Sequence, residues 1–194
     1  ASGANGIFYY KGPQGDILRN NNKVRCVRNI DSTSVVKNAY TLFSPMQSTD
    51  TFLIDEQGNN VHSWQSDHRP GLSVYLLDNG ELLRPGIVSD KPAVFFGTHP
   101  GNAGVIEILD WQSNVIWSTT VASETYLSHH DVEQLPNGNI LTIVWESKTS
   151  AEALALGRTN VSDESLWAGA IYEICRSSAA NNCADGEIVW RWSI

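Results

Sequence analysis

Two adjacent histidines and an aspartate are the residues of this sequence best suited to chemistry. His129, His130 and Asp131 stand in the stretch YLSHHDVEQLPNGNILTIVWE, directly ahead of an expected β-hairpin. A neutral imidazole is a nucleophile and a proton carrier near pH 7, and a neighbouring carboxylate can fix its tautomer. Because successive strand residues face opposite ways, we expect one histidine to face a site and the other to pack. The alternative is a strand entry with a structural histidine.

Cationic side chains that could hold an anion occur upstream. Arg84 ends the strand-like run ELLR, and His68 and Arg69 stand in the loop SDHRPG. Such side chains donate charge-assisted hydrogen bonds to the oxygens of an anion, so these three are our candidates for holding an anionic ligand. For His68 and Arg69 the alternative is a solvated turn. His62 takes a position that tryptophans hold in the repeats described below, which favours packing.

The spacing of two cysteines predicts one disulfide. Cys175 and Cys183 flank the polar segment RSSAANN between two apolar strands, a spacing that a hairpin-closing bridge can span. The alternative, two buried thiols, is disfavoured by so polar a loop. A disulfide implies an oxidising compartment, so we expect a periplasmic or secreted protein. Cys26 is left over, as a free thiol or with a partner outside the chain. No pair of ligands sits at zinc spacing, so we expect no metal and no other cofactor.

The overall composition argues against two classes of partner. The net charge is −8 over 194 residues, and the only basic cluster is the short KVRCVR, so we expect no nucleic-acid partner. No run approaches the roughly 20 apolar residues of a membrane-spanning helix, so we expect no membrane partner. Seven tryptophans and frequent Asn, Asp, Gly and Ser favour an all-β protein rich in turns.

One kind of hairpin recurs three times along the chain. Each copy consists of a strand, a polar turn and a second strand, as in TFLIDEQGNNVHSW (51–64), and the other copies span 105–120 and 170–192. Aligning the turns places His62, Trp117 and Trp190 in register. The copies therefore share one pattern of faces.

A second kind of hairpin lies between these copies. Segments 73–84 and 131–143 are each two strands around Asn-Gly, the strongest short hairpin signal. The two kinds repeat with periods of 55 and 58 positions, close to the ~40–50 residues of four-stranded propeller blades. We therefore predict an all-β fold of the β-propeller type. A β-sandwich, the alternative, leaves the alternation of two hairpin types unexplained.

The predicted domain organisation is an N-terminal extension of unknown role (1–32) and a partial propeller (33–194). About two and a half four-stranded blades are expected, at about 39–96, 103–168 and 169–194. Thr149 or Ser150 can cap a short helix that ends at Gly157, so a helical insertion is expected within 148–158. Because propellers close with about 4–8 blades, we expect further chains or a missing C-terminal portion to complete the ring.

Four motifs resemble the N-terminal part of the bacterial aryl-sulfate sulfotransferase (arylsulfotransferase) family. They are YTLFSPMQSTDTFLIDEQGNNVHSWQSDHRPGLSVYLLDNGELLR, IEILDWQSNVIWS, YLSHHDVEQLPNGNILTIVWESKTSAEALALGR and GEIVWRW, and they cover about residues 39–194. The resemblance implies a six-bladed propeller, usually exported, that moves a sulfuryl group from a phenolic sulfate ester to a phenol without a nucleotide donor. It also implies a sulfated histidine in the central channel, helped by further histidine and arginine side chains.

The resemblance also gives the candidate residues their expected roles. Small phenols are the expected substrates, with His129, His130 and Asp131 catalytic and with Arg84, His68 and Arg69 binding the substrate. In the family the histidine that becomes sulfated lies in a later blade, so it maps onto no residue of this chain. The alternative function is a non-catalytic secreted or surface propeller that binds a carbohydrate or a protein.

Overall fold

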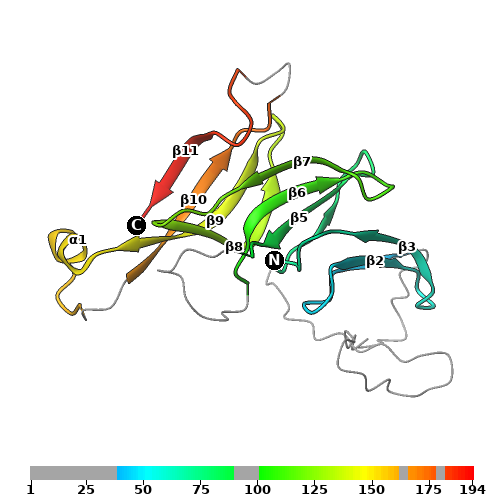
Figure 1. Cartoon of the computed structure of the whole chain (residues 1–194), viewed down its shortest axis with the longest axis horizontal. Helices are drawn as coiled ribbons and strands as arrows, with labels where there is room; N and C mark the ends of the chain where they lie inside the picture. Colours follow the sequence, from blue (N-terminus) through cyan, green and yellow to red (C-terminus); the bar gives the residue numbers. More distant parts are fainter. Residues whose placement is uncertain (1–38, 90–100, 162–165, 178–181) are drawn as a thin grey trace, which may run out of the picture.

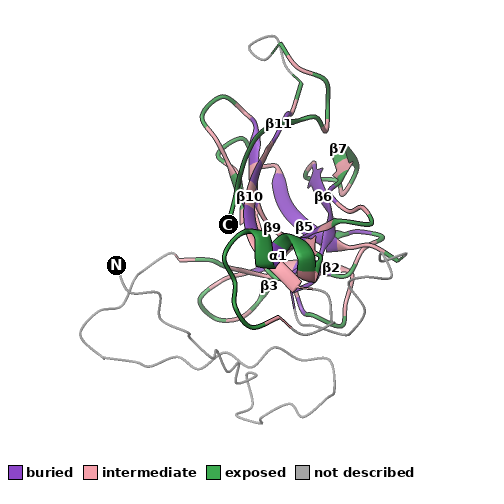
Figure 2. Cartoon of the chain, turned by 90° about the vertical axis from the view of Figure 1, so that its left-hand side faces the viewer, coloured by how far each residue is buried: buried purple, intermediate pink, exposed green. Residues whose placement is uncertain are grey.

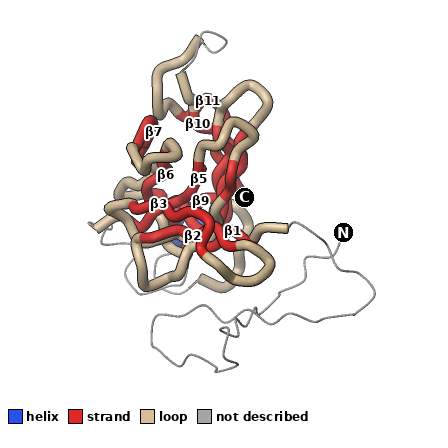
Figure 3. The backbone as a smooth tube through the Cα atoms, turned by 90° about the vertical axis from the view of Figure 1, so that its right-hand side faces the viewer, coloured by secondary structure: helices blue, strands red, loops and turns tan. Residues whose placement is uncertain are grey.

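The computed structural model describes residues 39–89, 101–161, 166–177 and 182–194 (Figure 1). The predicted extension 1–32 and Cys26 lie outside the described residues. Antiparallel strands make up most of the described chain (Figure 3), which confirms the all-β prediction. The helical insertion is confirmed as well, because α1 (Ser150–Ala155) is capped by a reciprocal pair of hydrogen bonds between Thr149 and Glu152.

Eleven strands of the described chain form three sheets. The first sheet has the order β1 (Thr41–Phe43), β2 (Asp50–Ile54) and β3 (Asn60–Gln65). The second has the order β4 (Tyr75–Leu76), β5 (Leu82–Ile87), β6 (Gly104–Leu109) and β7 (Val115–Thr120). The third has the order β8 (Tyr126–Gln134), β9 (Ile140–Lys148), β10 (Leu166–Ile174) and β11 (Ile188–Ser193). Neighbours in each sheet are neighbours in sequence.

Both predicted hairpin types are present, but their grouping into sheets differs from the prediction. The sheets span 41–65, 75–120 and 126–193, whereas the expected blades were about 39–96, 103–168 and 169–194. In the second and third sheets the Asn-Gly hairpin comes first and the polar-turn hairpin second. The prediction placed the polar-turn hairpin first in each blade and the Asn-Gly hairpin second. In the sequence, the long connection between the two hairpins of one sheet looks like the connection between two sheets.

The three sheets pack against one another in chain order. The core between the first and second sheets contains Leu53, Trp64, Leu82 and Leu109. The core between the second and third contains Leu83, Ile106 and Ile108 from one side and Val132, Ile140, Val144, Ala170, Tyr172 and Ile174 from the other. The second sheet is therefore covered on both faces, and β5 and β6 are buried along nearly their whole length (Figure 2).

The predicted disulfide between Cys175 and Cys183 is confirmed, with Cα atoms 6.2 Å apart. It closes the connection between β10 and β11. This connection also contacts the second sheet, because the Trp117 indole N–H donates to the Asp185 carboxylate at 3.0 Å. The bridge thus holds a loop that links two sheets. No helix within the described ranges is long and apolar enough to cross a membrane.

Candidate functional site

A β-bulge in β8 determines where the histidine pair lies. The pairing of β8 with β9 shifts between His129 and Val132, so His130 and Asp131 have no direct partner on β9. His130 adopts a φ of 60°, a conformation that costs a non-glycine residue free energy. Its backbone is held from two sides: its N–H donates to the Gly101 carbonyl at 2.7 Å, and its carbonyl accepts from the Ser73 N–H at 3.1 Å.

The two imidazoles contact each other, contrary to the expectation that they would face opposite ways. The Nδ1 atoms of His129 and His130 are 2.8 Å apart, and the ring centroids are 5.0 Å apart with the planes nearly perpendicular. The expectation assumed a regular strand, and the bulge with its positive φ turns the His130 side chain toward its neighbour. The site therefore contains a histidine dyad.

One Nδ1 of the dyad donates the hydrogen bond between the rings and the other accepts it. His129 also interacts with the backbone of Val144. Where His129 carries its proton on Nε2, its Nδ1 accepts from His130 Nδ1, and a lone pair remains on His130 Nε2.

His129 lies in an environment that keeps it neutral. Its half-buried ring stacks on Trp145 with centroids 4.1 Å apart. Burial, with a smaller contribution from His130, lowers the pKa of His129 from 6.5 to about 4. A neutral imidazole keeps one nitrogen that accepts, so His129 can accept a hydrogen bond from His130 near pH 7.

Lowering the pH is expected to destabilise the protein through His129. The unfolded chain takes up a proton at this residue below about 6.5, and the folded protein only near pH 4, so stability is lost as the pH falls through this window. We expect the urea midpoint to fall between pH 7 and pH 4.5, and to fall less in His129→Phe, whose ring can still stack on Trp145. An equal fall in both proteins would contradict this account.

Asp131 contacts a tyrosine rather than a histidine. Its carboxylate accepts from the Tyr75 hydroxyl at 2.8 Å and from the Val132 N–H at 2.9 Å. Burial and the carboxylate raise the pKa of Tyr75 to about 12. The prediction that Asp131 orients a histidine tautomer therefore does not fit these contacts, because its carboxylate pairs with Tyr75 while the two histidines pair with each other. Asp131 ties the bulge to β4 instead.

Gly101 lies against the ring of His130. It has a φ of 91°, and a Cβ built there would overlap the His130 ring. Glycine is thus needed for both the backbone conformation and the space. Sequence reasoning did not identify Gly101 or Tyr75, because their contacts with His130 and Asp131 depend on pairings between distant segments. It did not identify Trp145 either, because the stacking on His129 depends on the register of β8 against β9.

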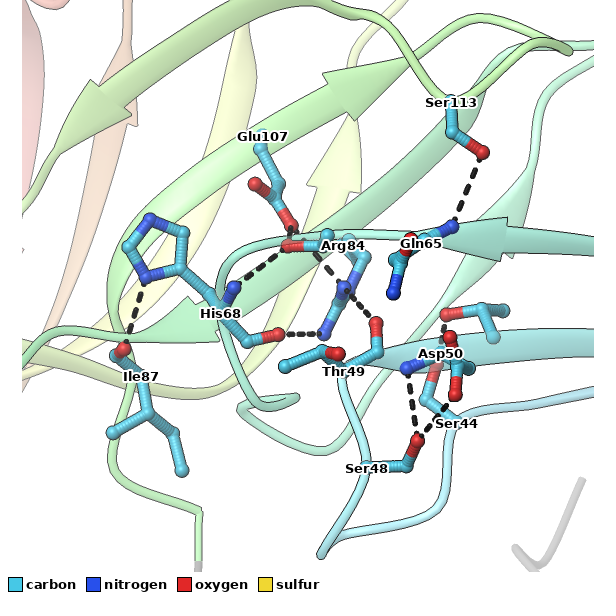
Figure 4. A network of polar contacts seen from close by, with 12 residues as sticks. Ser44, Ser48, Thr49, Asp50, Gln65, His68, Arg84, Ile87, Glu107 and Ser113 are labelled. Atoms are coloured by element: carbon cyan, nitrogen blue, oxygen red, sulfur yellow. Dashed lines mark hydrogen bonds and ion pairs between the residues drawn. The ribbon is translucent and has the colours of Figure 1, made fainter.

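Arg84 is buried between the first two sheets, which does not fit the predicted contact with substrate. Its guanidinium lies 3.2 Å from the Glu107 carboxylate, and the two side chains are 1% and 3% exposed. Figure 4 shows the same guanidinium donating to the carbonyl oxygens of His68, at 2.9 Å, and Thr49, at 3.4 Å. Ser66 also donates to Glu107. These contacts give Arg84 a structural role.

The connection between β3 and β4 carries the other two candidates. The His68 ring pairs through Nδ1 with the Ile87 carbonyl at 3.1 Å, which ties it to the end of β5. Arg69 is exposed, and its guanidinium makes one long contact of 3.4 Å with Gln47. Further along the same connection, Leu72 and Ser73 pair with His130. Arg69 is therefore an exposed cation on the segment that holds the bulge.

A cavity of about 620 Å³ lies along the third sheet, away from the dyad. Its lining includes Tyr126, Glu146, Lys148, Tyr172 and Arg191. The Glu146 carboxylate accepts from Tyr172, Ser193 and Lys148, so its oxygens are occupied by side chains of the protein. Among the described residues, no group of three or more His, Cys, Asp and Glu is arranged to hold a metal ion.

No family model and no curated protein matches the sequence. A solved structure of a protein of unknown function from Bacteroides caccae is similar, with a TM-score of 0.46 and 15% sequence identity. The similarity covers 88% of this chain and 49% of that protein, so this chain spans about half its length.

Proposed function

We propose that this chain belongs to a β-propeller aryl-sulfate sulfotransferase, and that His130 carries a proton in the transfer reaction. The observation on which the proposal depends is the histidine dyad on a strained bulge, with the two Nδ1 atoms 2.8 Å apart. We assign the proton between the rings to His130 Nδ1, which leaves a lone pair on His130 Nε2. Strained backbone persists where the surrounding structure enforces it, and such residues cluster at functional sites.

The proposed reaction moves a sulfuryl group from a phenolic sulfate ester to a phenol through a histidine. A histidine nitrogen attacks sulfur, the bond from sulfur to the aryl oxygen breaks, and the phenolate leaves. The acceptor phenol then attacks the sulfohistidine, loses its proton and releases the histidine. We assign to His130 Nε2 the removal of that proton, which then passes to water, while the phenolate released in the first step leaves as the anion or takes a proton from water. The resemblance puts the sulfated histidine in a later blade, so no residue here receives that role.

Two further features support the assignment. Exposed Arg69 lies on the segment that pairs with the bulge, where a guanidinium suits an anionic sulfate ester. The repeated hairpins and the packing of three sheets in chain order support a propeller. The disulfide supports an oxidising compartment, and we propose that the protein is periplasmic or secreted.

The direct test is transfer of sulfate from a chromogenic aryl sulfate to a phenol, followed by the release of the chromophore. We expect transfer by a wild-type protein that includes the later blade with the sulfated histidine. In the same protein His129→Ala should lose about 10²-fold or more, because the His130 tautomer is then no longer fixed. His62→Ala is the matched control, since His62 is a half-buried histidine that stacks on Trp111 in another sheet. Full activity in His129→Ala would contradict the proposal, and absence of transfer in the wild type would favour the non-catalytic alternative.

A further inference from the structure

The cavity along the third sheet contains groups that the proposed chemistry does not use. Its volume of about 620 Å³ lies within the range of small-molecule pockets. Tyr172 lines the cavity and belongs to the core between the second and third sheets. Arg191 on β11 pairs directly with Tyr172 on β10, and directly paired residues share a face of the sheet. Both side chains therefore lie on the face of the third sheet that is turned toward the second.

A buried carboxylate and its donors give the cavity a fixed wall. Glu146 Oε1 accepts from the Tyr172 hydroxyl at 2.7 Å and from the Ser193 hydroxyl at 2.8 Å. Its Oε2 accepts from the Lys148 ammonium group at 2.7 Å. Burial acts to raise the pKa of Glu146, but the hydrogen bonds from these three donors lower it below its usual value. The carboxylate is therefore ionised at neutral pH and balances the charge of Lys148.

Two polar groups of the cavity lining have no hydrogen-bond partner among the described residues. They are the hydroxyl of half-buried Tyr126 and the guanidinium of exposed Arg191. The Tyr126 ring is held edge-on to the ring of Tyr172, with centroids 5.4 Å apart. The cavity therefore combines an aromatic ring in a fixed place with a hydroxyl and a cation that are free to contact a ligand.

The remaining hydrogen-bonding capacity of the lining favours an anionic ligand. The oxygens of Glu146 are occupied, and Glu152 accepts through Oε2 from Thr149 in the cap of α1. Lys148 has three N–H groups and donates one of them to Glu146. Donors therefore exceed free acceptors, and the guanidinium of Arg191 suits a carboxylate, which it can bind through two parallel hydrogen bonds.

The side chains of the lining also favour a ligand with many hydroxyl groups. Among the lining residues only Ile188 and Val189 have aliphatic side chains. An apolar ligand would take the polar groups out of water without replacing their hydrogen bonds, which costs free energy. A sugar ring offers hydroxyl groups to such side chains and a face of C–H groups that packs on an aromatic ring.

We propose that this cavity binds a sugar acid of the hexuronate class, with the carboxylate at Arg191 and the sugar ring against Tyr126. The Tyr126 hydroxyl and the free N–H groups of Lys148 donate to the hydroxyl groups of the sugar. The cavity lining contains no residue of the histidine dyad, so this inference does not depend on the proposed chemistry.

The test is an NMR titration of the wild-type chain with glucuronate and galacturonate, with glucose and galactose as their uncharged counterparts. We expect saturable shifts of the Tyr126 resonances with at least one uronate, and affinity about 10-fold lower for its uncharged counterpart. Arg191→Gln should bind the uronate about 10-fold more weakly and lose this preference. Arg158→Gln is the matched control, because Arg158 is an exposed arginine outside the lining that donates to the Asn160 carbonyl, and its affinity should be unchanged.

Three results would overturn the proposal. The first is the absence of saturable binding with both uronates, and the second is equal affinity for a uronate and its uncharged counterpart. The third is tighter binding of benzoate than of either uronate, which would show that the cavity prefers an aryl acid to a sugar. Because Arg191 is exposed, Arg191→Gln should keep the urea midpoint of the wild type, so its loss of affinity reports on the site and not on folding.

Discussion

Replacing Arg84 with methionine is expected to lower the free energy of unfolding by about 3–5 kcal/mol, because the substitution leaves the Glu107 carboxylate buried without its cation. The two side chains are 1% and 3% exposed, and the guanidinium also bridges carbonyl oxygens of the first sheet and the connection that follows it. Urea unfolding of the variant beside the wild type measures the effect.

The double variant Arg84→Met with Glu107→Leu is the control for this prediction. Both charges are then absent, so most of the lost stability should return, as apolar pairs often replace buried ion pairs without cost. If Arg84→Met kept wild-type stability and lost affinity for aryl sulfates instead, the structural role would be wrong and the substrate-binding role predicted from the sequence would be right.

Replacing His130 with glycine is expected to reduce sulfuryl transfer by about 10²–10⁴-fold without lowering stability. The imidazole that carries the proton is removed, while glycine adopts a φ of 60° without the strain that a side chain imposes. Parallel measurements of transfer and of urea unfolding separate these two effects. A variant that lost stability together with activity would indicate a structural histidine.

Ser113→Gly is the matched control, because Ser113 is another non-glycine residue with a positive φ, 70°, at a turn of the second sheet. Relief of backbone strain is common to the two variants, whereas loss of an imidazole occurs in His130→Gly alone. Transfer by Ser113→Gly should equal that of the wild type. An equal loss of transfer in both would show that the backbone, and not the ring, determines activity.

The sequence predicted the hairpins because their signals are local. Asn-Gly turns and polar turns specify which strands are adjacent, and the positive φ of Gly80 and Gly138 agrees with their places in Asn-Gly turns. The grouping of hairpins into sheets depends on long-range pairing, such as that of β5 with β6 across residues 88–103. No local sequence pattern specifies that pairing. The predicted blades therefore began with the polar-turn hairpin, whereas the second and third sheets begin with the Asn-Gly hairpin.

For the candidate site, the sequence predicted which chemically reactive residues it contains, but not how they are arranged. Two adjacent histidines are conspicuous in a sequence, but the bulge that brings their rings together is not. Arg84 was taken as a substrate ligand because its partner Glu107 lies 23 positions away, on a neighbouring strand. Tyr75 contacts Asp131 and Gly101 contacts His130, each from another segment, and nothing in their local sequence indicates these contacts.

The most direct test of the central claim is a titration of the chain with an aryl sulfate, followed through the ring nitrogens of its histidines by long-range proton–nitrogen NMR. In the free protein at pH 7 we predict that His130 has its proton on Nδ1 and an unprotonated Nε2. Addition of aryl sulfate should shift the His130 resonances in a saturable way, while those of His62 stay unchanged. A proton on His130 Nε2, or an unaffected His130 while the ligand binds elsewhere, would contradict the account.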